Sequence, residues 1–202
     1  HCALAMMGEG KVHDENGNIV DSLSAMKKAG ITPIELQAKE GLALINGTDG
    51  MLGMLIMAIA DLRNLCSAAD ITTAMSIEGL LGTDKVFAPN LHAPLRKQIG
   101  QAVSAANLFA LLKDSEIVAS HFEGDTRVQD AYSLRCAPQV AGAVRDTIDY
   151  AQTIAERELA SAIDNPVVQP DGRVESNGNF HGAPVAYVLD FLAIAADRKS
   201  VV

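Results

Sequence analysis

The chain has 202 residues, of which 49% are hydrophobic, so it is long and apolar enough to bury a sizeable core. Its 16 basic and 25 acidic residues give a formal net charge of -9, which argues against nucleic acid or an anionic membrane as a partner and favours small molecules or sister subunits. Its three cysteines lie far apart without a CxxC spacing, a pattern that supports neither a zinc site nor a disulfide framework and that fits a reducing cytoplasm.

The first quarter of the chain predicts short elements. Residues 1–7 predict the end of a helix, and residues 11–20 predict a β-hairpin around an Asn-Gly pair, which tolerates the positive φ angles of a tight turn. A short helix with an Asp or Ser cap is expected over residues 22–30, followed by another helix over residues 33–44.

A long apolar segment begins at Thr48, which can cap it, and extends to about Leu81. Residues 51–57 are apolar on every side, which predicts complete burial inside the protein or between subunits. The longest run without charge, residues 50–60, is shorter than the ~20 apolar residues that cross a bilayer, so no membrane span is predicted. The methionines of this segment are interpreted as core residues that fill irregular gaps.

The second half of the chain alternates helices with short connections. Residues 82–92 are rich in Gly, Pro and Asn and predict a connector, and residues 93–112 predict a helix. From Val140 the apolar positions recur every three or four residues, which predicts a helix of about 25 residues. A second hairpin over 167–174 and a last helix over 184–196 follow. The predicted fold class is therefore mainly α: a bundle of long helices with two small β-hairpins.

Chemically capable side chains recur at every third position just before the helix that starts near residue 140. If residues 129–135 are helical, Gln129, Tyr132 and Arg135 share one face. Pro138 then starts a new helix whose free backbone N–H groups attract anions, and Arg135 can bind a carboxylate through two parallel hydrogen bonds. The spacing indicates half of an amino-acid site. The alternative interpretation is a Tyr and Arg pair that satisfies a helix kink.

Three polar stretches, at 46–48, 132–135 and 179–182, lie directly before predicted helix starts. Helix N-termini carry partial positive charge, so a fold that brought these stretches together would bind a carboxylate and stabilise a carbanion-like transition state. Asn46 and Asn165 also have a simpler interpretation as turn formers. The sequence contains no HExxH pair, no GxSxG motif and no phosphate-binding glycine loop, so a metal site has little support, and serine-hydrolase and nucleotide chemistry are not indicated.

Four motifs in this order resemble the aromatic amino-acid lyase family. They read EGLALINGT at 40–48, QDAYSLRCAPQV at 129–140, SAIDNP at 161–166 and SNGNFHG at 176–182. Four ordered motifs are hard to obtain by chance, and the resemblance covers the chain up to about residue 196. Ala131, Ser133 and Cys136 resemble the histidine-specific branch of the family more than the phenylalanine-specific one.

The resemblance implies an ammonia-lyase that converts L-histidine to trans-urocanate, the first step of histidine degradation, in a cytoplasmic, all-helical homotetramer whose sites draw on three chains. It implies these roles: Tyr132 as the base that removes the β-proton, Arg135 as the carboxylate ligand, Asn46, Gln129 and Asn165 as supporting hydrogen-bond partners, and Phe180 as a wall of the pocket. The family's electrophile is a 4-methylidene-imidazol-5-one group formed from an Ala-Ser-Gly triplet, and that triplet is absent from these 202 residues.

We expect the chain to be a fragment, because residues 1–7 do not read as the beginning of a helix or as a signal peptide, and because the family's triplet directly precedes this position. Residues 1–196 are interpreted as the central part of a helical lyase domain, and residues 197–202, which depart from the family pattern, as a non-native tail. Two other functions fit the same motifs. A phenylalanine or tyrosine ammonia-lyase, or an aminomutase of the family, would share all four, and a non-catalytic helical oligomerisation module would use the polar stretches only to cap and kink helices.

Overall fold

The computed structural model describes residues 1–197, which form two compact units. The hairpin unit comprises His1–Thr48 with Ala162–His181, and the helical unit comprises Asp49–Ser161 with the chain from Gly182 onward. The expected non-native tail at 197–202 lies outside the described residues except for Asp197.

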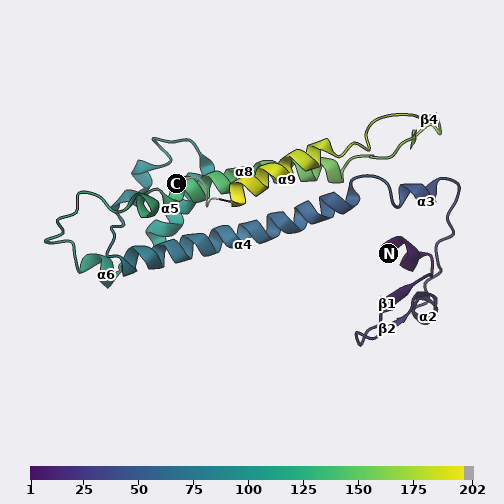
Figure 1. Ribbon diagram of the computed structural model, residues 1–202, viewed down its shortest axis with the longest axis horizontal. Helices are drawn as coiled ribbons and strands as arrows, with labels where there is room; N and C mark the ends of the chain where they lie inside the picture. Colours follow the sequence, from purple (N-terminus) through teal and green to yellow (C-terminus); the bar gives the residue numbers. More distant parts are fainter. Residues whose placement is uncertain (198–202) are drawn as a thin grey trace. The chain divides into compact units, whose positions relative to one another are not determined.

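Short elements make up the hairpin unit (Figure 1). They are α1 (Cys2–Met6), β1 (Lys11–His13), β2 (Ile19–Asp21), α2 (Ser22–Lys28), α3 (Glu40–Ala43), β3 (Val167–Val168) and β4 (Val174–Glu175). Both predicted hairpins are confirmed, because β1 pairs antiparallel with β2 and β3 pairs antiparallel with β4. Val12 lies opposite Val20, and Val168 lies opposite Val174. Local turn chemistry was therefore enough to predict these four strands.

The helix expected over residues 33–44 is wrong for most of its length, since only α3 is helical there. The Ile34 N–H donates to the carbonyl of Met6 at 3.0 Å, which ties this stretch to α1, and Lys39 has a φ of 77°, a left-handed conformation that stops a helix from extending backwards from Glu40. The Glu40 carboxylate instead accepts a hydrogen bond from the backbone N–H of Gln37 at 2.6 Å. The apolar spacing was helical, but these backbone restrictions override it.

The helical unit contains the long helices. Its elements are α4 (Asp49–Gly79), η1 (Lys85–Phe87), η2 (Pro89–Leu91), α5 (Ile99–Leu111), α6 (Glu116–Ala119), α7 (Tyr132–Arg135), α8 (Ala137–Leu159) and α9 (Ala183–Ala196). The predicted fold class, mainly α with two small hairpins, is confirmed. The helix predicted from residue 93 begins six residues later, at Ile99 in α5. The short helix α6 was not predicted. Its first turn is capped by the Ser115 hydroxyl, which accepts a hydrogen bond from the Val118 N–H at 3.2 Å.

Three long helices build the main apolar core: α4 and α9 run in one direction, and α8 runs in the other (Figure 1). This core consists of Leu52, Leu55, Ile59, Cys66, Ile148, Ala151, Ala155, Val185, Val188 and Leu192. A second core joins the end of α4 to η1, α5 and α6 through Ala74, Ile77, Phe87, Leu108, Leu112 and Val118. The end of α4 is thus held firmly, and the site described below is attached to it.

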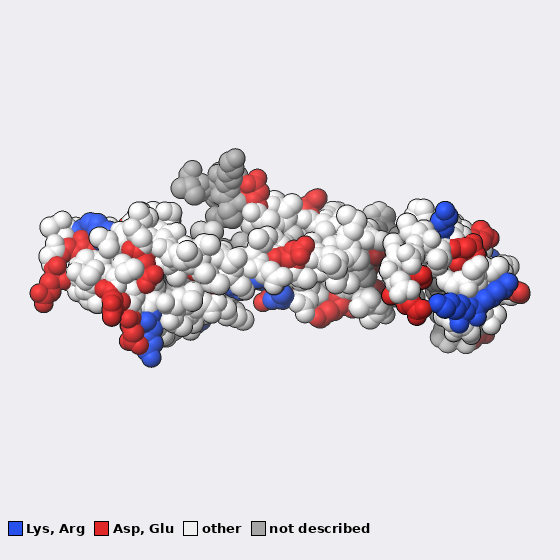
Figure 2. Space-filling view, turned by 90° about the horizontal axis from the view of Figure 1, so that it is seen from below, with Lys and Arg blue, Asp and Glu red and all other residues white. Residues whose placement is uncertain are grey.

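The prediction of complete burial for residues 51–57 is wrong within this one chain, because Met54 and Met57 are 73% and 65% exposed. The helix α4 packs one face on α8 and α9, and its other face is open. By length and composition alone α4 could also cross a bilayer, but core helices of soluble proteins meet the same criterion, and α4 carries Arg63 and Asp70, which pair with charged side chains of α8. On the face drawn in Figure 2, acidic side chains are scattered along the molecule, and Lys and Arg side chains gather at the right-hand end.

A buried polar cluster joins α4, α5 and α8, and we call it the polar crossing. Its centre is Asp70, which is 3% exposed and accepts hydrogen bonds from Ser104 Oγ at 2.5 Å, Asn107 Nδ2 at 2.8 Å and Arg145 Nη2 at 2.6 Å. The same Arg145 nitrogen donates to the carbonyl of Cys66 at 3.1 Å. The buried carboxylate is therefore both paired and hydrogen-bonded, as buried charges in proteins must be.

The helices α5 and α8 touch backbone to backbone at Gly100 and Gly142. A Cβ added at Gly100 would collide with the Gly142 carbonyl oxygen and lie 2.8 Å from Arg145 Cβ, and a Cβ added at Gly142 would collide with the backbone of Gln101. The Gly100 N–H donates to Asp146 Oδ1 at 2.7 Å. This crossing lies near the start of α8 and fixes that helix against α5.

Candidate active site

Three of the predicted site residues lie in the segment between α6 and α8. Only Tyr132 to Arg135 are helical, and Gln129 lies in irregular chain before them. The predicted single helical face over 129–135 is therefore wrong. Ala131 is extended, with φ -53° and ψ 142°, and the Asp130 carboxylate accepts a hydrogen bond from the backbone N–H of Thr83 at 2.7 Å. This long-range bond holds the segment away from helical geometry.

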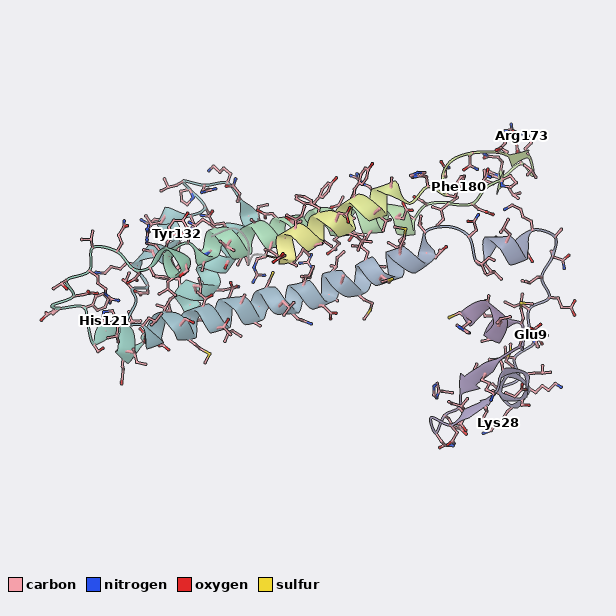
Figure 3. All side chains as sticks on the ribbon, in the orientation of Figure 1. Glu9, Lys28, His121, Tyr132, Arg173 and Phe180 are labelled. Carbon is pink, nitrogen blue, oxygen red and sulfur yellow. The ribbon has the colours of Figure 1, made fainter. Side chains whose placement is uncertain are left out.

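Tyr132 and Arg135 do lie together, as the spacing predicted. The guanidinium carbon of Arg135 is 5.7 Å from the centroid of the Tyr132 ring, and its Nε donates to the carbonyl of Asp130 at 3.4 Å. Tyr132 is 68% exposed and lies at the end of the bundle where α8 begins (Figure 3). A phenol and a guanidinium are thus presented side by side on a short helix.

A cavity of about 420 Å³ adjoins Arg135 and Gln129. Its wall includes His92, which is 4% exposed. The amide nitrogen of Gln101 lies 3.1 Å from His92 Nδ1 and can only donate, so Nδ1 accepts and Nε2 donates to the Val86 carbonyl at 3.0 Å. Both ring nitrogens thus fix the imidazole in the wall, and Arg135 places a positive charge at this cavity.

The chain breaks before α8 as predicted, but the break lies at Cys136, with φ -100° and ψ 9°, and Ala137 is already helical. The helix start offers fewer free N–H groups than expected. Pro138 has none, and the N–H groups of Gln139 and Val140 donate to the Cys136 carbonyl at 3.1 and 3.2 Å. The group best suited to bind a carboxylate here is consequently the Arg135 guanidinium rather than the helix end.

In the hairpin unit, Asn165 is part of a local hydrogen-bond network. Its Oδ1 accepts from the Asn177 N–H at 2.9 Å and from Ser176 Oγ at 3.3 Å, so its amide N–H groups are the ones suited to meet a ligand. The preceding Asp164 carboxylate forms an ion pair with Lys39, and hydrogen bonding to that lysine lowers the pKa of the Asp164 carboxyl. The turn around Asn165 is thus fixed from both sides.

The two remaining predicted residues lie just before helix starts. Asn46 is exposed, its N–H donates to the Leu42 carbonyl at 2.9 Å, and it precedes α4 by three residues. Phe180 is 41% exposed and precedes α9 by three residues; Figure 3 labels it in the segment that leads to that helix. Both therefore have the exposure that a ligand contact requires.

The expected convergence of the three helix starts does not occur within one chain. The starts of α4 and α9 lie at one end of the bundle, and α8 starts at the other end, beside the end of α4 (Figure 1). Since α4 has 31 residues, these ends are ~46 Å apart at about 1.5 Å per residue. Tyr132 and Arg135 thus lie at the opposite end of α4 from the helix start that Asn46 precedes.

Sequence reasoning missed the residues that hold the site segment. The Arg127 guanidinium donates to the carbonyls of Leu80, at 3.1 Å, and of Leu81, and to both oxygens of Asp125. Hydrogen bonding from Arg127 lowers the pKa of the Asp125 carboxyl to about 2, and the same contact raises the pKa of Arg127. The only sequence signal was the run of charged residues at 125, 127 and 130 beside Gln129.

Comparison with known proteins places these residues in a family context. Residues 1–200 match the family model described as aromatic amino acid lyase. The chain is 65% identical over 196 residues to a histidine ammonia-lyase of Streptomyces avermitilis. Among solved structures it resembles a histidine ammonia-lyase from Trypanosoma cruzi, with 41% identity and a TM-score of 0.77, and a tyrosine aminomutase from Streptomyces globisporus, with 37% identity and a TM-score of 0.81.

These matches cover nearly all of this chain but less than half of each relative. The shares are 97% of this chain and 38% of the Streptomyces avermitilis protein, 96% and 36% for the Trypanosoma cruzi structure, and 96% and 40% for the aminomutase structure. The chain therefore spans about two fifths of the length of the relatives that it matches.

Proposed function

Because this chain belongs to the aromatic amino acid lyase family, we propose that the full-length protein removes ammonia from L-histidine and releases trans-urocanate. The observation that carries the proposal is the contact between Tyr132 and Arg135 within the motif at 129–140, with Arg135 in the wall of a cavity. The 65% identity to the Streptomyces avermitilis histidine ammonia-lyase supports histidine as the substrate.

The residues of the site divide the work in this proposal. Arg135 binds the carboxylate of the amino acid through two parallel hydrogen bonds, and its charge stabilises the negative charge that develops when the β-proton leaves. Tyr132 takes that proton as the phenolate and becomes the neutral phenol. Gln129 supports the bound substrate from the cavity wall. Asn46, Asn165 and Phe180 complete the pocket with two carboxamides and one apolar ring.

The aromatic amino acid lyase family uses a 4-methylidene-imidazol-5-one group, which supplies an electrophile for the amino group of the substrate. The side chains found here fit such a group by their chemistry, because a phenol, a guanidinium and carboxamides bind a substrate and move a proton but offer no electrophile. We propose that an Ala-Ser-Gly triplet elsewhere in the parent chain forms the group, since these 202 residues contain no such triplet.

The positions of the helix ends support an oligomeric site. One chain carries Tyr132 and Arg135 ~46 Å along α4 from the helix start next to Asn46, so a compact pocket needs these residues from different copies. We propose a cytoplasmic homotetramer whose sites draw on three chains. Its proposed partners are its own copies and a small amino-acid substrate. Nucleic acid and membranes are not proposed as partners, because the net charge of -9 disfavours binding to anionic surfaces.

Two alternatives stay open. The likeness to the tyrosine aminomutase of Streptomyces globisporus favours a second enzyme function, an aminomutase or a lyase acting on tyrosine or phenylalanine. The other alternative is a non-catalytic helical oligomerisation module, in which the exposed apolar face of α4 would be the contact surface between copies.

A panel of substrates tested on the full-length protein distinguishes the proposed function from these two alternatives. We expect ultraviolet absorbance from urocanate with L-histidine and no product with L-tyrosine or L-phenylalanine. An amino-acid product with the amino group moved to the β-carbon would identify an aminomutase, and no turnover of any of the three substrates would favour the module. The 202-residue chain assayed alone is the control, and it should be inactive because it lacks the triplet.

A further inference from the structure

Asp130 connects Arg135 to the end of α4. Its side chain is 7% exposed; Oδ2 accepts from the backbone N–H of Thr83 at 2.7 Å, and Oδ1 lies 3.6 Å from Arg127 Nη1. The backbone carbonyl of the same residue accepts from Arg135 Nε at 3.4 Å. The carboxylate is thus tied to the connector after α4, and the carbonyl is tied to the guanidinium that the proposed reaction needs.

The connector that receives the Asp130 carboxylate is itself firmly placed. The Gly82 N–H donates to the Ile77 carbonyl at 2.7 Å, and Ile77 is 1% exposed in the second core. A Cβ added at Gly82 would lie 3.0 Å from Ile77 Cγ2 and 3.2 Å from Asp130 Oδ2. The carboxylate therefore packs against the end of α4 with no spare room.

Arg127 adds a second attachment at the same helix end. Its guanidinium donates to the carbonyls of Leu80 and Leu81, which directly follow the last turn of α4. Carbonyls at a helix C-terminus lack intrahelical donors and carry partial negative charge, so a cation is stabilised there. The segment from 127 to 130 is consequently bound to α4 by one cation and one anion.

Arg135 depends on this segment. In the described part of the chain, the Asp130 carbonyl is the one hydrogen-bond acceptor of its side chain. A guanidinium held through Nε keeps both Nη groups for the two oxygens of a carboxylate, which is the geometry that gives arginine its specificity. A small displacement of that guanidinium would misplace the substrate, and misplacement on the scale of 1 Å is costly to catalysis.

We propose that Asp130 is a positioning residue, which through its carboxylate fixes the carbonyl that orients Arg135 and so sets the affinity for the substrate carboxylate. This inference rests on the proposed function. It predicts a defect in KM that a purely structural role for Asp130 would not produce.

The test compares Asp130→Ala with Asp146→Ala in the full-length protein. Asp146 is a matched control, because its carboxylate also accepts a backbone N–H at 2.7 Å, from Gly100, but between α5 and α8. We expect Asp130→Ala to raise KM for L-histidine about tenfold or more, and Asp146→Ala to lower the melting temperature with KM unchanged. Asp130→Asn keeps an acceptor for the Thr83 N–H and should recover most of the affinity.

Two further measurements test the role of Asp130. Gly82→Ala crowds the same carboxylate from the other side and should also raise KM. Hydrogen exchange followed by mass spectrometry needs no activity: peptides from 126–137 should exchange faster in Asp130→Ala and not in Asp146→Ala. Equal KM changes in the two alanine variants, or unchanged exchange over 126–137, would overturn the inference. If the wild-type protein turns over no substrate, the proposed function is wrong, and exchange alone decides whether Asp130 holds the segment.

Discussion

The polar crossing and the Tyr132 to Arg135 helix both contain a guanidinium in the helical unit, but they differ in how many partners the chain gives them. Asp70 in the polar crossing accepts hydrogen bonds from three side chains and is 3% exposed. Among residues 1–197, the Arg135 side chain has one hydrogen bond, at 3.4 Å, and the Tyr132 ring as a neighbour, and it lines a cavity. The Asp70 carboxylate finds its cation and its donors within one chain, and Arg135 keeps donors for a ligand. Changes in the first should therefore alter stability, and changes in the second should alter activity.

The largest effect is expected in the polar crossing. Arg145→Met would leave the Asp70 charge buried without its cation, which typically costs about 3–5 kcal/mol of unfolding free energy. Arg63→Met is the control, because Arg63 pairs with Asp149 at 2.7 Å but both side chains are about half exposed, at 47% and 59%. That variant should lose less than about 1 kcal/mol. Unfolding curves of the two full-length variants test the contrast, and equal losses would contradict it.

Tyr132→Phe should have the next largest effect, and on activity alone. If Tyr132 is the base, kcat falls by at least about 10²-fold while the melting temperature holds. A tyrosine that only fills the kink would instead cost about 0.5–1.5 kcal/mol of stability and leave turnover intact. A β-deuterated histidine sharpens the test, because an isotope effect that grows in the variant locates the defect in proton removal. A variant that melts early but turns over normally would remove Tyr132 from catalysis.

Arg135→Lys should weaken substrate binding by about 1.5–3 kcal/mol, since lysine keeps the charge but loses the two-pronged geometry. Initial rates over a range of L-histidine concentrations measure this as a rise in KM. Arg157→Lys, on the last turn of α8 and outside the site, is a control for the substitution itself. Unchanged KM and kcat in Arg135→Lys would show that Arg135 contributes to stability and not to substrate binding.

The smallest effect concerns pH. Because the pKa of Asp125 is lowered to about 2, its contact with Arg127 contributes stability that is present above the ordinary carboxyl pKa near 4 and lost as the pH falls toward 2. Wild-type protein should melt slightly above Asp125→Asn at pH 6, and the gap should shrink between pH 4 and pH 2. A gap that stays constant over this range would show that the carboxylate charge plays no part.

Elements set by local chemistry were predicted correctly from the sequence. The hairpins follow from turns at Gly17 and Gly172, whose φ angles are 81° and 85°, and α9 and α8 follow from their apolar spacing. The predictions failed where distant contacts decide the backbone. The bond from Thr83 to Asp130 spans 47 residues and keeps Gln129 out of a helix, and no local pattern announces it.

The candidate site shows the same division. The pairing of Tyr132 with Arg135 is a matter of one helical turn, so the spacing was sufficient to predict it. The distance between that pair and the starts of α4 and α9 depends on the direction in which each long helix runs. Alternating directions place alternate helix starts at opposite ends of a bundle, and single stretches of sequence do not show this.

The contact between Gly100 and Gly142 bears on attempts to change the substrate by selection from variant libraries. Neither position accepts even a methyl group, and both lie outside the cavity wall, so a library designed around the pocket would leave them out of consideration. In a random library selected for activity, clones with substitutions at Gly100 or Gly142 would be lost as completely as clones with substitutions at Arg135. Sequencing the survivors would then reveal two invariant positions that owe nothing to substrate recognition, and a ranking of positions by intolerance alone would mistake a helix crossing for a binding residue.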